Sequence, residues 1–285
     1  MTSRPALAPG LPFFLPTPAG QRFCLFHAPL ASVGIRAAVL YAHPFGEEMN
    51  RSRRIAALQA RAFAAAGIAV LQIDLHGCGD SIGDFAEARW QNWKNDLALA
   101  HGWLADKVQV PVSLWGLRLG ALLMLDYASQ ASRPVDRLIL WQPVTNGQAG
   151  LTQWLRLRLA SRMLDSDGNH DHDGGTHALR TTLAQGQSLE VAGYELAPEL
   201  AAAIDAVDAA ALAPVGHEVD WFDIAASAGR PMTPAASRII ADWQCQGVKI
   251  RHHQVVGQAF WSLPEITSCP ALTSATLAAL CTEAT

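Results

Sequence analysis

The chain has 285 residues, of which 50% are hydrophobic and 16% are charged, and its formal net charge at pH 7 is −4. This composition is typical of a compact globular protein and leaves little room for a long disordered tail. Because the net charge is small and negative, no overall field favours nucleic acid or an anionic membrane. The five cysteines lack the paired spacing of a zinc site or a disulfide framework, and we expect neither a metal nor a cofactor.

The N-terminal residues do not have the pattern of a targeting signal. Pro5, Pro9, Pro12 and Pro16 interrupt the region in which a signal peptide needs an unbroken apolar helix. Elsewhere no apolar run approaches the roughly 20 residues that are needed to span a bilayer. We therefore expect a cytoplasmic protein without a transmembrane segment.

Short apolar runs alternate with longer segments of helical periodicity along most of the chain. This alternation predicts a mostly parallel, eight-stranded sheet with helices on both faces, built as a single domain over residues 1–285. The runs with strand character cover residues 21–28, 35–42, 68–74, 110–115, 135–141, 218–224 and 248–256. Helical periodicity covers residues 53–66, 90–104 and 118–130, and a short helix is expected at the C-terminus.

The regular alternation stops between about residues 145 and 215, where we expect a helical lid inserted before the last two strands. Within it, residues 151–164 form an amphipathic helix whose arginines lie opposite its leucines. Those arginines are expected in solvent, and contact with a membrane surface is the alternative. The following tract, 165–177, holds four aspartates and three histidines; it predicts a hydrated loop, with weak metal binding as the alternative.

The segment Gly116-Leu117-Arg118-Leu119-Gly120 stands between a predicted strand and a predicted helix. Its glycines allow a turn sharp enough to raise the middle side chain above the sheet. This pattern is that of the nucleophile elbow of the α/β-hydrolase fold, but Arg118 stands where that fold places its serine. The alternative is a surface arginine on an ordinary strand–helix turn.

Two further turns resemble those of α/β-hydrolases. Residues 43–46, His-Pro-Phe-Gly, follow a predicted strand, and they resemble the loop that supplies a backbone N–H to the oxyanion hole. Residues 74–81, which begin with Asp74 and end with Ser81, match the superfamily's Asp-x-x-Gly-x-Gly-x-Ser turn. Together with the expected insertion, these turns predict the α/β-hydrolase fold.

Longer motifs resemble a narrower family, the second type of exosortase A system-associated hydrolases. The resemblance runs from about residue 12 to residue 275, through His43–Asn50 with Arg53-Arg54, LQIDLHGCGDS, WGLRLGALL, LILWQPV, VAGYEL and VVGQAFW. Such proteins accompany bacterial genes for exopolysaccharide synthesis and protein sorting. The resemblance implies a hydrolase-like protein of that system, and the family name does not establish a reaction.

Serine-dependent acyl transfer needs a nucleophile, a base that takes its proton and an acid that orients the base. Arg118 cannot act as the nucleophile, and it stays protonated at all relevant pH values. In the turn after the last strand, Phe260 stands where the fold places its histidine. Asp223 is a candidate acid, but without a base we expect it to have nothing to orient. His252 and His253 are expected to be structural or exposed on opposite faces of the last strand.

A charged pocket remains above the elbow, and we expect Arg118 to pair with Glu47 or Glu48 inside it. Arg118 would otherwise hold a ligand carboxylate or phosphate by bidentate hydrogen bonds. Glu48 is also a candidate general base for a water molecule. The other candidate ligand-binding residues flank these groups in the predicted turns: His43, Phe45, Leu119, Ser81 and Phe260.

Two residues are candidates for a replacement nucleophile. Ser81 and Cys78 lie in the turn after the fourth strand, near the expected pocket mouth, and His43 or His76 would have to approach them in space. We expect Ser81 to bond the local backbone and Cys78 to pack instead.

Two functions are compatible with this pattern. The first is an ester or acyl-group hydrolase, or an acyltransferase, with unusual catalytic residues. The second is a non-catalytic hydrolase scaffold that binds an acidic or lipid-like ligand or a protein partner. In both, a small-molecule or lipid-like ligand occupies the pocket under the lid, and the chain is expected to bind no nucleic acid; a homodimer is possible.

Overall fold

The computed structural model describes residues 9–165 and 175–281. Within them the strands are β1 (Leu11–Thr17), β2 (Gly20–His27), β3 (Ala37–Ala42), β4 (Ile68–Ile73), β5 (Val112–Leu117), β6 (Arg137–Trp141), β7 (Leu189–Val191), β8 (Tyr194–Leu196), β9 (Glu218–Ala225) and β10 (Lys249–Val256). The helices are α1 (Glu47–Ala65), α2 (Trp90–Val108), α3 (Leu119–Ala128), α4 (Gly147–Asp165), α5 (Gly175–Ala184), α6 (Pro198–Asp205), α7 (Pro234–Cys245) and α8 (Pro270–Cys281). Two short 3₁₀ helices, η1 (Phe85–Glu87) and η2 (Ala209–Ala211), complete the elements.

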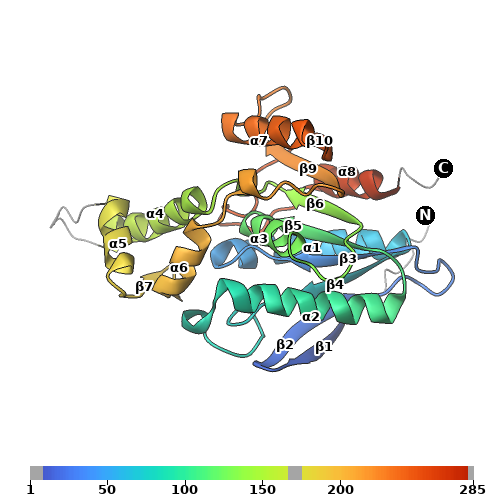
Figure 1. Ribbon diagram of the computed structural model, residues 1–285, viewed down its shortest axis with the longest axis horizontal. Coiled ribbons are helices and arrows are strands. Elements are labelled where there is room, and N and C mark those ends of the chain that lie inside the picture. Colours follow the sequence, from blue (N-terminus) through green and yellow to red (C-terminus); the bar gives the residue numbers. More distant parts are fainter. Residues whose placement is uncertain (1–8, 166–174, 282–285) are drawn as a thin grey trace.

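Eight strands form one sheet in the order β1-β2-β4-β3-β5-β6-β9-β10 (Figure 1). The pairs β1–β2 and β2–β4 are antiparallel, and all other neighbours in this sheet are parallel. The expected mostly parallel, eight-stranded sheet is therefore confirmed. Because the parallel strands run the same way, the loops that follow β3, β5 and β6 gather at one edge of the sheet.

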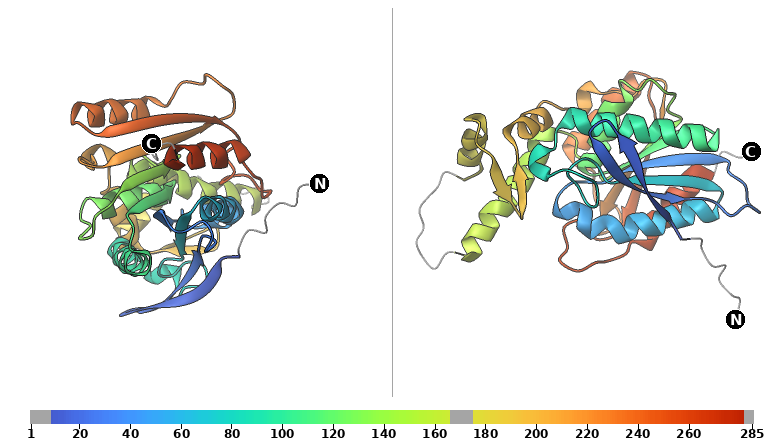
Figure 2. Two further views of the ribbon diagram at one scale, coloured as in Figure 1. Left: turned by 90° about the vertical axis from the view of Figure 1, so that its right-hand side faces the viewer. Right: turned by 90° about the horizontal axis from the view of Figure 1, so that it is seen from below.

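Successive residues of the central strands face two different cores. In β3, Leu40 packs into one hydrophobic cluster, whereas its neighbours Val39 and Tyr41 pack into the other. The first cluster lies under α2, α3 and α7, and the second lies under α1 and α8. Figure 2 shows this arrangement from the end of the molecule, with α1 and α8 on one side of the sheet. Burial on both faces explains the continuous apolar runs from which the strands were predicted.

Strand β1 and the start of helix α1 differ from the sequence prediction. Strand β1, Leu11–Thr17, was not predicted, and it includes Pro12 and Pro16. Proline is tolerated there because β1 is an edge strand of the sheet, where an N–H without a ladder partner costs little. Helix α1 starts at Glu47, six residues before the predicted start, because its first turn is polar and carries no apolar periodicity.

The segment between β6 and β9 contains α4, α5, the β7–β8 hairpin, α6 and η2. Of these, α4, α5, β7 and α6 lie together at one end of the molecule (Figure 1), whereas η2 packs against α7. Side chains join this segment to the rest of the chain. The Asn50 amide donates to the Tyr194 hydroxyl at 2.9 Å, and Arg89 pairs with Glu199 at 3.4 Å. Most of the predicted Asp- and His-rich loop, residues 166–174, lies outside the described residues, as do the side chains of the last turn of α4.

Candidate functional site

The turn between β5 and α3 has the backbone of a sharp elbow. Arg118, at its apex, has φ 56° and ψ −119°, a conformation that residues other than glycine rarely adopt. Three backbone hydrogen bonds hold it: the Arg118 amide donates to the Trp141 carbonyl, and the Arg118 carbonyl accepts from the amides of Ala121 and Val144. The strained residue is thus fixed by α3, by β6 and by the chain that follows β6.

The two glycines of the elbow are required by close packing. A Cβ atom on Gly116 would lie 2.4 Å from the Cα atom of Ala121. On Gly120 it would lie 2.5 Å from the carbonyl oxygens of both Ala42 and His43. Because these neighbours are backbone atoms, they cannot move aside as a flexible side chain would. The glycines therefore let α3 approach both β5 and the loop after β3.

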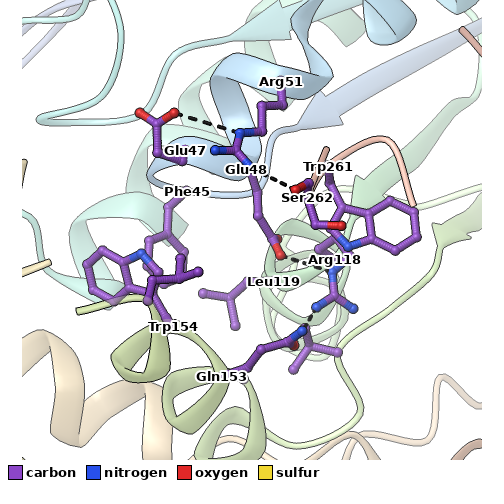
Figure 3. Close-up of a pocket in the computed structure, with 13 residues that line it drawn as sticks. Phe45, Glu47, Glu48, Arg51, Arg118, Leu119, Gln153, Trp154, Trp261 and Ser262 are labelled. Atoms are coloured by element: carbon purple, nitrogen blue, oxygen red, sulfur yellow. Dashed lines mark hydrogen bonds and ion pairs between the residues drawn. The ribbon is translucent and has the colours of Figure 1, made fainter. Parts of the chain in front are cut away.

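The Arg118 guanidinium group is held by residues from four different elements or loops, of which Figure 3 shows Glu48, Gln153 and Trp261. Its Nε lies 3.3 Å from Oε1 of Glu48, and its NH2 donates to Oε1 of Gln153 at 2.8 Å. A longer bond of 3.5 Å joins NH1 to the Gln142 carbonyl, and the group lies over the Trp261 ring, 5.2 Å from the ring centre. The expected pairing of Arg118 with Glu48 is therefore present in the structure.

Glu48 lies in the first turn of α1 and is the anion nearest to Arg118 in the described residues. Burial raises the pKa of the Glu48 carboxyl, and the Arg118 cation and its hydrogen bond offset only part of this effect. Arg51, one turn along the same helix, acts in the same direction as Arg118 but more weakly. Glu47 points away from Arg118 and instead lies 3.9 Å from Nε of Arg51.

A pocket of about 100 Å³ opens above the elbow. Its walls are largely apolar, and its polar groups are the charged side chains, Gln153 and Ser262 (Figure 3). It is lined by Phe45, Glu47, Glu48, Arg51, Arg118, Leu119, Val144, Gly150, Gln153, Trp154, Leu157, Trp261 and Ser262. Of the predicted site residues, the structure brings together Phe45, Glu47, Glu48, Arg118 and Leu119 here, and it places His43, Ser81, Asp223 and Phe260 outside the lining.

His43 is buried beneath this pocket and has a structural role. Its Nδ1 bonds the Pro44 carbonyl oxygen, and its Nε2 accepts from the Leu75 amide. This pattern requires a neutral ring with the proton on Nδ1. Burial lowers the pKa of His43, which favours the same neutral form. The residue thus joins the loop after β3 to the turn after β4.

The two replacement nucleophiles also have local partners. The Ser81 hydroxyl donates to the Asp74 carbonyl and accepts from the Phe23 amide, which confirms the expected bonding to backbone. Cys78 is packed in the hydrophobic core, and burial raises the pKa of its thiol far above the usual range. Both features disfavour a reactive nucleophile in this turn.

The histidines of β10 correct one expectation. Asp223 was expected to have nothing to orient, yet its Oδ2 lies 2.9 Å from Nε2 of His252. His253, on the other face of the strand, bonds the buried carboxylate of Asp220 at 2.7 Å. The sequence prediction failed because these pairs join neighbouring parallel strands, and strand register is not visible in a linear motif. Phe260 itself is buried in the core and packs against Trp261.

None of the described helices combines the length and the apolar content that are needed to cross a membrane. Over residues 9–165 and 175–281, no group of three or more His, Cys, Asp or Glu side chains is arranged to hold a metal ion. The polar side chains that line the described pocket belong to Glu47, Glu48, Arg51, Arg118, Gln153 and Ser262.

Comparison with known proteins places this geometry in a family. The model of the family described as serine aminopeptidase, S33, matches residues 34–178, about half of the chain. The chain belongs to this S33 family of α/β-hydrolases. The matched region of this S33-family member runs from the start of β3 into α5 and includes the elbow. No curated protein matches the chain.

Solved structures support the same fold for this S33-family chain. A soluble variant of monoglyceride lipase from Saccharomyces cerevisiae, in complex with a substrate analogue, is 13% identical, with a TM-score of 0.65 over 100% of this chain and 99% of that one. Est1E from Butyrivibrio proteoclasticus, with bound ferulic acid, is 12% identical, with a TM-score of 0.64 over 94% and 97%. A thermostable carboxyl esterase from Bacillus coagulans, in complex with glycerol, is 11% identical, with a TM-score of 0.64 over 96% and 98%.

Several residues of the pocket in this S33-family chain were not found from sequence. Gln153, Trp154 and Leu157 come from α4, and Trp261 and Ser262 come from the loop after β10. A weak signal existed for Trp261, because it directly follows the predicted histidine position. For the α4 residues there was none, because the sequence does not show which face of an inserted helix meets the elbow.

Proposed function

We propose that the chain is a hydrolase-family scaffold whose elbow pocket recognises an acyl-type ligand without serine chemistry, within an exosortase-linked exopolysaccharide system. The observation that carries this proposal is Arg118 at the base of an apolar pocket. Among the described residues, three of the five guanidinium N–H groups have protein acceptors, and the other two are available to a ligand oxygen. The exosortase link rests on the motifs that the chain shares with that family.

The proposal excludes the standard serine mechanism because of two residues. Arg118 occupies the elbow apex, where acyl transfer requires a hydroxyl or thiol nucleophile. Phe260, in the turn after β10, has no group that accepts a proton. The His252–Asp223 pair does not replace it, because neither residue lines the pocket.

The same proposal treats residues 145–215 as the lid of the pocket. Its support is that α4 contributes Gln153, Trp154 and Leu157 to the lining. Leu157 is 45% exposed at this pocket. A ligand that reaches Arg118 would cover this side chain.

Replacing Arg118 by alanine should weaken ligand binding by about tenfold or more, because a hydrogen bond to a charged group contributes about 1.5–3 kcal/mol. The measurement is a titration with butyrate, benzoate and ethyl butyrate, followed by the fluorescence of the pocket tryptophans, Trp154 and Trp261. The matched control is Arg133→Ala, which removes an exposed arginine paired with Asp106 outside the pocket. A loss of thermal stability in Arg118→Ala without any change in binding would contradict the proposal.

A second function, an ester or acyl hydrolase or an acyltransferase, is favoured by one observation. Burial raises the pKa of Glu48 in the direction that a general base at neutral pH requires. Glu48 would then deprotonate a water molecule, and Arg118 would stabilise the oxyanion that forms on the acyl carbonyl.

Purified protein assayed against p-nitrophenyl esters of increasing chain length distinguishes the two functions. The binding function predicts no turnover above the rate in buffer. Turnover that is insensitive to serine-directed phosphonates, abolished by Glu48→Gln and retained by Glu47→Gln would instead establish the atypical enzyme. Glu47 is the appropriate control because it lines the same pocket without contacting Arg118.

A further inference from the structure

The edge of the Arg118 guanidinium group that carries Nε and NH2 contacts two oxygens, which belong to two different side chains. Oε1 of Glu48 lies on Nε and Oε1 of Gln153 lies on NH2. These two N–H groups are parallel and adjacent, and a single carboxylate commonly takes both of them in a bidentate pair. Glu48 and Gln153 together therefore occupy the place of one ligand carboxylate.

The distance between Arg118 and Glu48 is long for an ion pair that would keep a ligand from the arginine. At 3.3 Å it is longer than the roughly 2.7–2.9 Å of a strong charge-assisted hydrogen bond. The side chains of both partners are reachable, since Glu48 is 26% exposed and Gln153 is exposed at the surface of α4. A ligand oxygen can therefore replace either acceptor without unfolding an element.

The size of the pocket limits the apolar part of such a ligand. Its volume is about 100 Å³, whereas a dry cavity of about 150 Å³ is sufficient for benzene. The walls around this space are Phe45, Leu119, Val144, Trp154 and Trp261. A short alkyl chain fits such a space, whereas an aromatic ring or a long acyl chain requires Leu157 to move.

We propose that the ligand is a short-chain or aryl carboxylate whose two oxygens displace Glu48 and Gln153 from Arg118. The proposal rests on the proposed function, because it specifies the ligand of the same pocket. Glu48 is then an internal competitor that keeps Arg118 neutralised while the pocket is empty. Ligand binding breaks the hydrogen bond between Arg118 and Gln153, so it removes this link between Arg118 and α4.

Removing the charge of Glu48 should strengthen carboxylate binding. Isothermal titration calorimetry of Glu48→Gln with benzoate and butyrate should show dissociation constants about tenfold lower than for the wild type, since a competing anion is lost. Glu218→Gln, a control outside the pocket, should stay within about threefold of the wild type because Glu218 pairs with Arg137 and Lys249, away from Arg118. Benzamide and butyramide, which are neutral, should bind more weakly than the acids to all three proteins.

Adding a negative charge beside Arg118 should weaken carboxylate binding. Gln153→Glu places a second carboxylate on the same edge of Arg118 and should weaken benzoate binding by about tenfold. Because Gln153 is exposed, this substitution is expected to leave the fold intact, which circular dichroism checks. Weaker benzoate binding with unchanged benzamide binding separates the electrostatic effect from a steric one.

Acidification provides an independent readout when the probe keeps its charge, as benzenesulfonate does. Among the described residues, the charged groups that face Glu48 are Arg118 at the start of α3 and Arg51 on α1. Burial raises the pKa of Glu48, and its protonated form no longer competes for Arg118. Wild-type affinity should therefore rise as the pH falls from neutrality, whereas Glu48→Gln should show no such rise.

The outcomes separate this inference from the proposed function. If Glu48→Gln binds benzoate no more tightly than Glu218→Gln, the displacement of Glu48 is wrong. If the neutral amides bind as well as the acids, the carboxylate class is wrong, but the pocket still binds an acyl-type ligand. If none of the probes binds to any of the proteins, both the inference and the proposed function are wrong.

Discussion

Replacing Asp220 by alanine should lower the free energy of unfolding by about 3–5 kcal/mol, the usual cost of removing one member of a buried charge network. Asp220 has no exposed surface, and its carboxylate binds three cationic or protonatable groups. Arg251 lies at 2.9 Å, Arg137 at 3.1 Å and His253 at 2.7 Å. These contacts join β6, β9 and β10 at one edge of the sheet. Urea denaturation, followed by tryptophan fluorescence, measures the loss.

Glu218 provides the matched control because it belongs to the same network but lies near the surface. Its side chain is 35% exposed and pairs with Arg137 and Lys249. Glu218→Ala should therefore cost only about 0–1 kcal/mol, as is usual for an exposed pair. Equal losses in Asp220→Ala and Glu218→Ala would show that burial of the network contributes nothing.

The Asp220 contribution should also depend on pH. Burial by itself raises the pKa of this carboxyl, but hydrogen bonds from His253 and Arg251 outweigh burial and hold the pKa below its usual value. Because the folded-state pKa is lowered, the stabilisation is present above the unfolded pKa of about 3.9 and is lost as the pH falls through the folded-state value. The difference in stability between the wild type and Asp220→Ala should therefore shrink in acid.

Gly120→Ala should lower the stability of the fold by about 3 kcal/mol, the upper end of overpacking in a tight core. The new Cβ atom would lie 2.5 Å from the carbonyl oxygens of Ala42 and His43, and both are backbone atoms. Relief requires α3 to move away from the loop after β3, which would displace Arg118 from Glu48. Thermal unfolding measures the cost, and a benzoate titration tests the displacement.

Gly102→Ala is the control for this change because it adds the same methyl group inside a helix. At Gly102 of α2 the added Cβ would meet only the Arg133 side chain, at 3.4 Å. Since alanine is favoured over glycine inside helices by about 1 kcal/mol, this variant should be as stable as the wild type or more stable. If Gly120→Ala were tolerated equally well, the close approach at the elbow would not matter for folding.

Much of the scaffold was predictable because its signals are local. The parallel strands are buried on both faces and therefore appear as apolar runs, and the glycines around Arg118 mark the elbow. The pairing of Arg118 with Glu48 could be proposed because the fold brings the loop after β3 close to the start of α3. Strand β1 was missed because its prolines suggested a break, and they are tolerated only because β1 forms the edge of the sheet.

The sequence by itself determined the α/β-hydrolase scaffold and the presence of an arginine at the apex of its elbow. Only the tertiary structure decided what that arginine contacts, because its partners lie on α1, on α4 and in the loops after β6 and β10. The same holds for the carboxylate partners of His252 and His253, which depend on the register of two parallel strands. Periodicity and turn chemistry act over a few residues, whereas a binding site is assembled by packing between distant segments, which no local pattern encodes.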